Sequence, residues 1–199
     1  MMNLKTSLLL ALGIAAPVLA APPAKTATAY FAAGCFWSAE RDMSEVPGVV
    51  DVVSGYTGGK VKNPTYDAVS TGMTGHVEAV RVVYDPAKIS YAALLQAYWH
   101  NVDPVAVKAQ FCDAGDEYRS AIFYTSPAEK QAAEASKVTV AKKMGQPVAT
   151  EVMAASAFYP AEEYHQDYAQ RNPGHYMAYR MGCGRDARLA EVRKKLDAK

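Results

Sequence analysis

The chain has 199 residues and a formal net charge of +1; 50% of its residues are hydrophobic and 21% are charged. This length allows one domain with a sizeable core and leaves little room for a second. Lysine and arginine are scattered along the chain rather than gathered in a stripe with interleaved aromatic residues. The sequence therefore gives no electrostatic footprint for a nucleic-acid partner.

The start of the chain is organised like a secretory signal peptide. Lys5 gives a positive beginning, and the apolar run over residues 8–16 is shorter than the roughly 20 residues that span a bilayer. Small residues up to Ala20 suit a signal peptidase. We therefore predict a signal peptide over residues 1–20, export to the periplasm, and a single mature domain over residues 21–199 without stable membrane insertion. An uncleaved membrane anchor is the alternative.

The hydrophobic pattern changes between strand-like and helix-like periods along the rest of the chain. Ser90 and Pro127 mark helix starts, and Gly145 marks a helix end. In chain order, the predicted elements are a strand at 28–33, a helix at 35–43, strands at 49–56 and 76–84, a helix at 90–100, a strand at 118–125, a helix at 127–145, a strand at 148–155, a helix at 161–170 and a basic helix from 185.

This order predicts an α+β fold, a two-layer sandwich in which helices cover one mixed sheet. The arrangement resembles a ferredoxin-like core with additions, the last of which is a C-terminal extension. The segment 177–184 within that extension has little periodicity, and glycines flank its Cys183. We expect this tail to be able to move.

The chain contains three cysteines, Cys35, Cys112 and Cys183. They lie far apart, so there is no Cys-x-x-Cys pair of the zinc type, and we predict no metal site. An odd number of cysteines in an exported protein leaves at least one thiol unpaired. Such a thiol is either a buried apolar residue or a redox or nucleophilic group.

Cys35 has surroundings that suit a reactive thiol. It follows Gly34 at the start of a predicted helix, where free backbone N–H groups and the helix dipole favour the thiolate. Phe36 and Trp37 can form an apolar wall for a small group such as a methyl thioether. A core cysteine next to core aromatic residues would give the same pattern, so composition alone leaves both readings open.

The third predicted strand carries a carboxyl group on an apolar face. Because side chains alternate along a strand, Glu78 shares its face with Val80 and Val82, whereas Arg81 points the other way. Desolvation would raise the pKa of such a carboxyl and let it donate a proton near neutral pH. The alternative is a strand-end carboxylate in water or paired with His76.

Several motifs together resemble the A-type peptide methionine sulfoxide reductases. The likeness runs from about Thr28 to Leu189. Its motifs are Gly34-Cys35-Phe36-Trp37, Tyr66, Gly75-His76-x-Glu78-Ala79-Val80, Tyr118-Arg119-Ser120-Ala121-Ile122 and Glu163-Tyr164-His165-Gln166.

The resemblance implies reduction of methionine S-sulfoxide, free or in oxidised proteins and peptides, without a cofactor. It also implies a role for each matching residue: Cys35 attacks the sulfoxide sulfur, Glu78 protonates the oxygen, Tyr66 and Tyr118 hydrogen-bond that oxygen, Phe36 and Trp37 hold the S-methyl group, Asp113 contacts the substrate backbone and His165 lines the pocket. Cys35 would become a sulfenic acid, which a second thiol converts to a disulfide. A thioredoxin-fold dithiol would then reduce that disulfide.

The second thiol differs from the common family pattern. Many relatives carry a cysteine where this chain has Met177, and the next thiol here is Cys183. We expect Cys183 to resolve the sulfenic acid of Cys35, because its glycine neighbours allow the tail to swing. Cys112, beside Asp113, is the alternative.

Two other classes of function compete with a reductase. A cysteine hydrolase or acyltransferase would use His165 or His76 to activate Cys35, although the aromatic pair and the apolar glutamate do not supply an oxyanion site. An interaction module would keep its function after Cys35→Ser.

Overall fold

The computed structural model describes residues 25–198, and the predicted signal peptide lies outside them. Within that range, no helix is both long and apolar enough to cross a membrane. The main sheet has the strand order β7-β6-β1-β3-β2-β8. Its strands are β1 (Ala27–Ala32), β2 (Val49–Thr57), β3 (Val77–Tyr84), β6 (Ala121–Tyr124), β7 (Glu151–Ala154) and β8 (Tyr159–Pro160), and β4 (Ala109–Gln110) pairs with β5 (Asp113–Ala114) separately.

The central four strands confirm the ferredoxin-like core. Their order, β6-β1-β3-β2, is the arrangement of a strand–helix–strand repeat in which the last strand pairs beside the first. All pairs in the main sheet are antiparallel except β6 with β7, which run parallel. The sheet is therefore mixed, as predicted.

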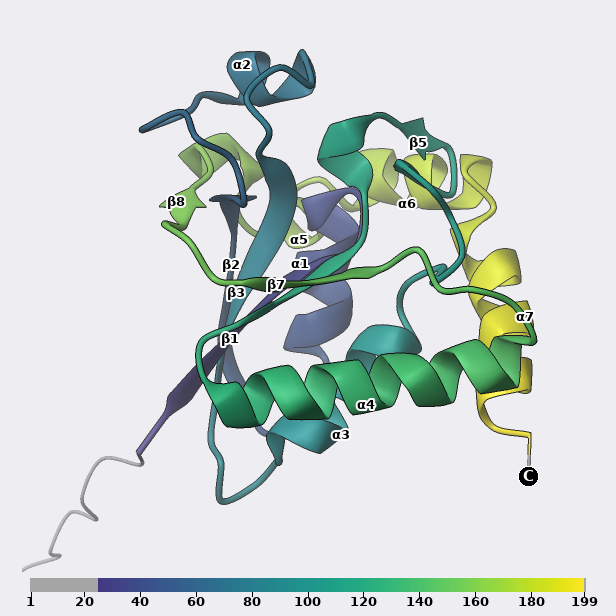
Figure 1. Cartoon of the computed structure of the whole chain (residues 1–199). Helices are drawn as coiled ribbons and strands as arrows, with labels where there is room; N and C mark the ends of the chain where they lie inside the picture. Colours follow the sequence, from purple (N-terminus) through teal and green to yellow (C-terminus); the bar gives the residue numbers. More distant parts are fainter. Residues whose placement is uncertain (1–24, 199) are drawn as a thin grey trace, which may run out of the picture.

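Helices and short turns complete the chain (Figure 1). The helices are α1 (Phe36–Ser44), α2 (Tyr66–Ser70), α3 (Tyr91–Trp99), α4 (Pro127–Met144), α5 (Tyr168–Arg171), α6 (Pro173–Gly182) and α7 (Arg185–Leu196), with 3-10 turns at Asp116–Tyr118 and Glu163–His165. The predicted helix starts are present: Ser90 accepts a hydrogen bond from the first turn of α3, and Pro127 begins α4, whose first turn is also capped by Ser126. Gly145 ends α4 in the left-handed conformation.

The two faces of the sheet are covered differently. The face that carries Phe31, Val80 and Val82 forms the main core with residues from α1, α3, α4 and α7. The opposite face, with Val77, Ala79 and Phe123, is covered by a smaller apolar cluster around Phe158. The helices thus lie on one face, which is the two-layer sandwich that the sequence predicts.

Several predicted boundaries are wrong. The strand expected at 118–125 begins only at Ala121, because Tyr118 ends a 3-10 turn. The helix expected at 161–170 is interrupted at Asp167, whose φ of +52° is incompatible with a continuous helix.

The largest difference concerns the tail. Residues expected to be irregular form α6, because Pro173 occupies the first turn of that helix, where its missing N–H needs no partner. Pro173 therefore begins this helix, although a proline at this place can equally mark the end of the preceding one. Cys183 is therefore the residue that ends an ordered helix.

Candidate active site

Cys35 lies between the first strand and the first helix. It is the N-cap of α1, and the N–H groups of Ser38 and Ala39 donate to its carbonyl oxygen. Gly34 before it has a φ of +79°, and a Cβ atom there would lie 2.4 Å from Cβ of Gln110. Glycine is thus required both by the backbone angle and by the segment packed against it, as the sequence suggested.

The resting state of the Cys35 thiol differs from the prediction. Its side chain is buried, and burial together with the nearby charge of Glu78 raises the pKa of the thiol to about 12. The helix start alone would favour the thiolate. In this state desolvation outweighs the helix, and Cys35 is a protonated thiol.

Glu78 lies on β3 directly beside the start of α1. Its Oε2 accepts a hydrogen bond of 2.9 Å from the backbone N–H of Phe36. The side chain is 3% exposed, and burial raises the pKa of the carboxyl to about 8. His76 is not its partner, because the imidazole of His76 contacts the Val61 carbonyl and the Gly59 N–H instead. Glu78 is therefore a neutral acid near pH 7, next to the nucleophile.

Tyr66 and Tyr118 each bring a phenol close to Glu78 and Cys35. Burial is the main cause that raises the pKa of both hydroxyls, and the charge of Glu78 raises it further. Both phenols lie near enough to Glu78, to Cys35 and to each other for these groups to influence their pKa. Glu162 holds Tyr66 in place by accepting its backbone N–H at 2.8 Å.

An aromatic wall stands beside the thiol. Phe36 and Tyr66 pack on His165 with ring centroids 4.9 and 4.4 Å apart, respectively. Trp37 Nε1–H donates to Nδ1 of His165 at 3.0 Å. The proton of the neutral ring is therefore on Nε2, and burial lowers the pKa of His165. That Nε2 is buried and has no hydrogen-bond partner among residues 25–198.

Asp113 and Tyr179 close the site from the side of the tail. The Tyr179 hydroxyl donates to Oδ2 of Asp113 at 2.5 Å, and Tyr179 lies near enough to Cys35 for each group to affect the pKa of the other. Burial raises the pKa of the Asp113 carboxyl. The side chain of Tyr179 thus lies between Asp113 and Cys35 and links them.

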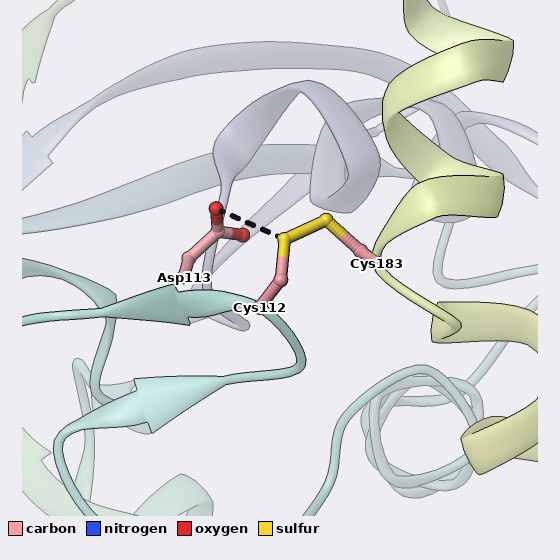
Figure 2. Close-up of side chains that lie close together, drawn as sticks. All are labelled: Cys112, Asp113 and Cys183. Carbon is pink, nitrogen blue, oxygen red and sulfur yellow. Dashed lines mark hydrogen bonds between the residues drawn. A yellow bond between two sulfur atoms is a disulfide. The ribbon is translucent and has the colours of Figure 1, made fainter.

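The other two cysteines form a disulfide, with their Cα atoms 4.9 Å apart (Figure 2). Cys183 therefore pairs with Cys112, while Cys35 is left free in the described part of the chain. Cys112 Sγ lies 3.8 Å from Oδ1 of Asp113; this contact becomes a hydrogen bond only after reduction, because a disulfide sulfur carries no proton. The bonded sulfurs offer no thiolate to a metal in this state.

The structure thus brings together eight of the predicted site residues, namely Cys35, Phe36, Trp37, Tyr66, Glu78, Asp113, Tyr118 and His165. Cys183 lies at the edge of this group through its disulfide to Cys112. The placement of His165 and His76 supports no general base for a hydrolase, because the nitrogens that could accept a proton already have partners.

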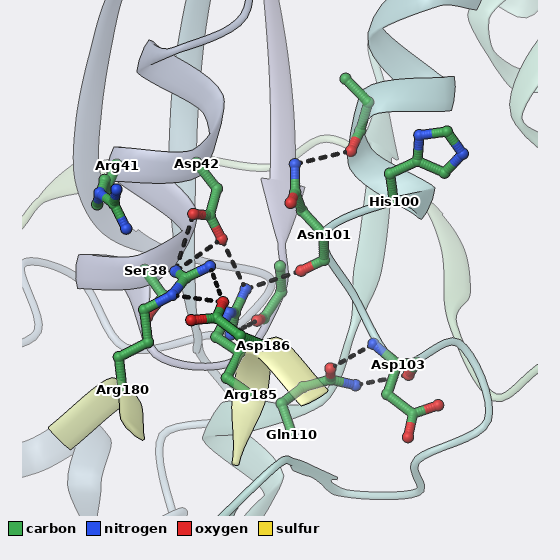
Figure 3. A network of polar contacts seen from close by, with 12 residues as sticks. Ser38, Arg41, Asp42, His100, Asn101, Asp103, Gln110, Arg180, Arg185 and Asp186 are labelled. Atoms are coloured by element: carbon green, nitrogen blue, oxygen red, sulfur yellow. Dashed lines mark hydrogen bonds and ion pairs between the residues drawn. The ribbon is translucent and has the colours of Figure 1, made fainter. Parts of the chain in front are cut away.

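Two features of the site were missed from the sequence. Tyr179 is one of 13 tyrosines, and only its i,i+4 spacing to Cys183 on a helix could have indicated its place. The second feature is a buried ion cluster that connects α1 with α6 and α7 (Figure 3). Asp42 accepts from Arg180 at 2.8 Å and from Arg185 at 3.4 Å, and these two arginines flank Cys183 in sequence.

Comparison with known proteins gives a consistent result. The family described as "Peptide methionine sulfoxide reductase" matches residues 27–197. The protein "Peptide methionine sulfoxide reductase MsrA 2" of Caulobacter vibrioides is 56% identical over 182 residues, which is 91% of each chain. Reduced Mxr1 from Saccharomyces cerevisiae has a TM-score of 0.73 at 32% identity, over 77% of this chain and 89% of Mxr1.

A second structure of Mxr1, in complex with Trx2, has a TM-score of 0.53 at 26% identity and covers 76% of this chain and 90% of Mxr1. The family match covers nearly all of the described residues, and the motifs that carry the site lie within it. The chain therefore belongs to the peptide methionine sulfoxide reductase A family.

Proposed function

We propose that this chain reduces methionine S-sulfoxide with Cys35 as the nucleophile and Glu78 as the proton donor. The observation that carries the proposal is the hydrogen bond from the Phe36 N–H to Glu78 Oε2. It places a neutral carboxylic acid against the residue that follows the thiol. Sulfoxide oxygen is a poor leaving group until it is protonated, so an acid and a sulfur nucleophile must act on the same molecule.

The first step transfers the oxygen to the enzyme. Glu78 donates its proton to the sulfoxide oxygen while the Cys35 sulfur attacks the sulfoxide sulfur. Tyr66 and Tyr118 hydrogen-bond the oxygen, and the thiol proton restores the acid. The attack forms an S–S bond between Cys35 and the substrate. The substrate S–O bond then breaks as the hydroxyl bonds to the Cys35 sulfur, the S–S bond breaks to release the thioether, and Cys35 is oxidised to a sulfenic acid.

The remaining groups suit the rest of the substrate. Phe36 and Trp37 offer a wall for the S-methyl group. Asp113 can accept a backbone N–H of the substrate, and Nε2 of His165 is a buried donor without a partner in the described chain. A peptide supplies both an N–H and a carbonyl, so these two groups fit methionine sulfoxide in proteins and peptides as well as the free amino acid.

The second step closes a disulfide. The sulfenic acid of Cys35 and a thiol form an S–S bond and release water. The close packing of Gln110 on Gly34 supports Cys112 as the first thiol to attack, and the bond between Cys112 and Cys183 supports Cys183 as the thiol that then releases Cys35. Direct attack of Cys183 on the sulfenic acid of Cys35, which we expected from the sequence, is the alternative that has not been tested. In Cys183→Ser we expect mass spectrometry to find Cys35 linked to Cys112.

An external dithiol then returns the enzyme to its reduced form. Mxr1 has been solved with Trx2, which supports a thioredoxin-fold protein as the reductant here. We also propose that the chain is exported after cleavage behind Ala20, on the basis of Lys5 and the apolar run that follows it. N-terminal sequencing of the mature protein from the periplasm tests this, and a protein that retains Met1 there would contradict it.

The reaction is tested with separated epimers. The chain and dithiothreitol should convert the S epimer of a methionine sulfoxide peptide to the thioether and leave the R epimer unchanged. Cys35→Ser should abolish the conversion. A Cys35→Ser protein that keeps wild-type activity would overturn the proposal, and activity on a thioester without activity on sulfoxides would favour a hydrolase.

A further inference from the structure

Tyr179 lies against the groups that the proposed reaction assigns to the substrate. Its hydroxyl donates to Asp113, and it lies near enough to the Cys35 thiol to affect the pKa of that thiol. Its ring meets Trp37 edge-on, with centroids 6.0 Å apart. Cys35 is only 7% exposed. One side chain therefore satisfies the carboxylate, covers the nucleophile and fills part of the aromatic wall.

The disulfide holds the helix turn that carries this tyrosine. Cys183 is the C-cap of α6, and its N–H donates to the carbonyl oxygen of Tyr179 at 3.0 Å. Its sulfur is bonded to Cys112, the residue before Asp113. Figure 1 shows α6 beside β5, which begins at Asp113. The disulfide thus connects Tyr179 to the segment that supplies its hydrogen-bond acceptor.

Apart from the disulfide, α6 has few buried contacts. Its buried side chains are Tyr176 and Arg180. Tyr176 donates to Ser38 Oγ at 3.3 Å, and Arg180 donates to Asp42 at 2.8 Å. Both contacts are polar, and the desolvation of a buried ion pair offsets much of its attraction. Once the disulfide is open, α6 is thus held mainly by these polar contacts and by aromatic packing on Trp37.

The end of α6 also has the features of a hinge. Gly184 follows Cys183 with a φ of +62°, and a Cβ atom at Gly182 or Gly184 would meet no atom within 4 Å. Two glycines with open space around them let the backbone turn without a clash. The backbone between α6 and α7 can therefore turn at this point, and such a turn breaks the ion pair between Arg180 of α6 and Asp186 of α7.

We propose that the Cys112–Cys183 disulfide is a latch that keeps Tyr179 over Cys35, so that the oxidised enzyme excludes sulfoxide until a dithiol opens it. The dithiol gives two electrons and two protons; Cys112 and Cys183 become thiols, and the dithiol becomes a disulfide. Tyr179 then leaves Asp113 and Cys35 to the substrate. This inference rests on the proposed function of the site.

Opening the latch also activates the nucleophile. Burial is the largest cause of the raised pKa of Cys35. Once Tyr179 has left, water reaches the sulfur and weakens the desolvation that raises the pKa of Cys35; this exceeds the loss of the smaller, lowering contribution of Tyr179, and the helix N-terminus can favour the thiolate. The same movement admits the substrate and prepares the attacking sulfur.

Alkylation of Cys35 tests the latch without using the sulfoxide reaction. The full chain is prepared with the disulfide closed and, separately, reduced with a phosphine. Each form is treated with iodoacetamide at pH 8, and the Cys35 peptide is quantified by mass spectrometry. We expect Cys35 to react roughly tenfold or more slowly in the closed form, because both its exposure and its thiolate fraction are lower. Equal rates in the two forms would overturn the proposal.

Variants separate the phenol from the disulfide. Tyr179→Ala with the disulfide intact should react at the rate of the reduced wild type, and the Cys112→Ser, Cys183→Ser double variant should react quickly with or without the phosphine. Met181→Ala is the matched control, because Met181 lies on the same helix and is 70% exposed; its rates should equal those of the wild type. Slow alkylation in a folded Tyr179→Ala protein would contradict the latch even if the enzyme reduces sulfoxides normally.

Discussion

The half of the site that carries Cys35 and Glu78 is built on a buried strand and helix, whereas the half that carries Tyr179 and Cys183 is attached by polar contacts and one disulfide. Glu78 lies in the central strand β3, whose backbone pairs on both sides. By contrast, α6 buries only Tyr176 and Arg180. The chemistry that needs fixed geometry is thus on the rigid half, and the recycling chemistry, which needs movement, is on the half that can open.

A substitution of Glu78 in the rigid half should reduce catalytic activity without destabilising the fold. In Glu78→Gln the amide oxygen still accepts the Phe36 N–H, but the side chain cannot donate an acid proton. We expect kcat/KM for the S-sulfoxide to fall by roughly 10²- to 10⁴-fold, with a melting temperature no lower than that of the wild type. Activity within a factor of a few of the wild type would remove Glu78 from the mechanism.

A substitution of Asp42, which anchors the attached half, should reduce the stability of the fold. Asp42→Ala leaves Arg185 buried without a carboxylate and leaves Arg180 with only the exposed Asp186, so we expect the free energy of unfolding to fall by about 3–5 kcal/mol in urea titrations. Glu45→Ala is the matched control, because it removes an exposed pair with Arg41 at the end of the same helix; its effect should stay below about 1 kcal/mol. Equal losses in both variants would show that Asp42 does not hold the tail.

The contact between the two halves can be broken at Gly34. Alanine there needs a φ of +79° and brings Cβ to 2.4 Å from Gln110 Cβ, so we expect a loss of stability of roughly 1–3 kcal/mol from backbone strain alone. In the reduced enzyme, formation of the disulfide that involves Cys112 should slow after one turnover. Gly174→Ala, at a helical position with nothing within 4 Å, should leave that step unchanged. Similar behaviour of the two variants would argue against the Gly34–Gln110 packing.

The pH dependence of the single-turnover rate of the reduced enzyme reports on the protonation of Glu78. The pKa of Glu78 is raised to about 8, so the donor is present below that pH, and the single-turnover rate limited by the acid should fall about tenfold per pH unit above it. The folded state binds this proton more tightly than the unfolded state, so its stabilising effect is complete below pH 4.5 and is lost as pH rises to about 8. Glu78→Gln should flatten the pH dependence of stability over this window. A wild type with an equally flat dependence would mean that Glu78 is exposed to water.

Local rules were sufficient for the rigid half. The alternation of β3 was enough to assign Glu78 to the helix-covered face, and Gly34 followed by Cys35 was enough to place the thiol at a helix start. The pKa of Cys35 was not predictable in this way, since it depends on what covers the thiol. The same is true of Tyr179 and of the cysteine pairing. Both depend on how α6 packs against segments more than 60 residues away. In addition, Pro173 is compatible with either the end or the start of a helix, so the sequence did not reveal α6.

The hydrogen bond between Phe36 and Glu78 has a stereochemical consequence. Because Oε2 is occupied as an acceptor, the acidic hydrogen must be on Oε1 and leave in one fixed direction. A sulfoxide sulfur is pyramidal and bears a methyl group, a longer chain, an oxygen and a lone pair, so it is chiral. A one-sided source of the hydrogen, combined with an aromatic wall that accepts the methyl group, can match only one of its two mirror-image forms.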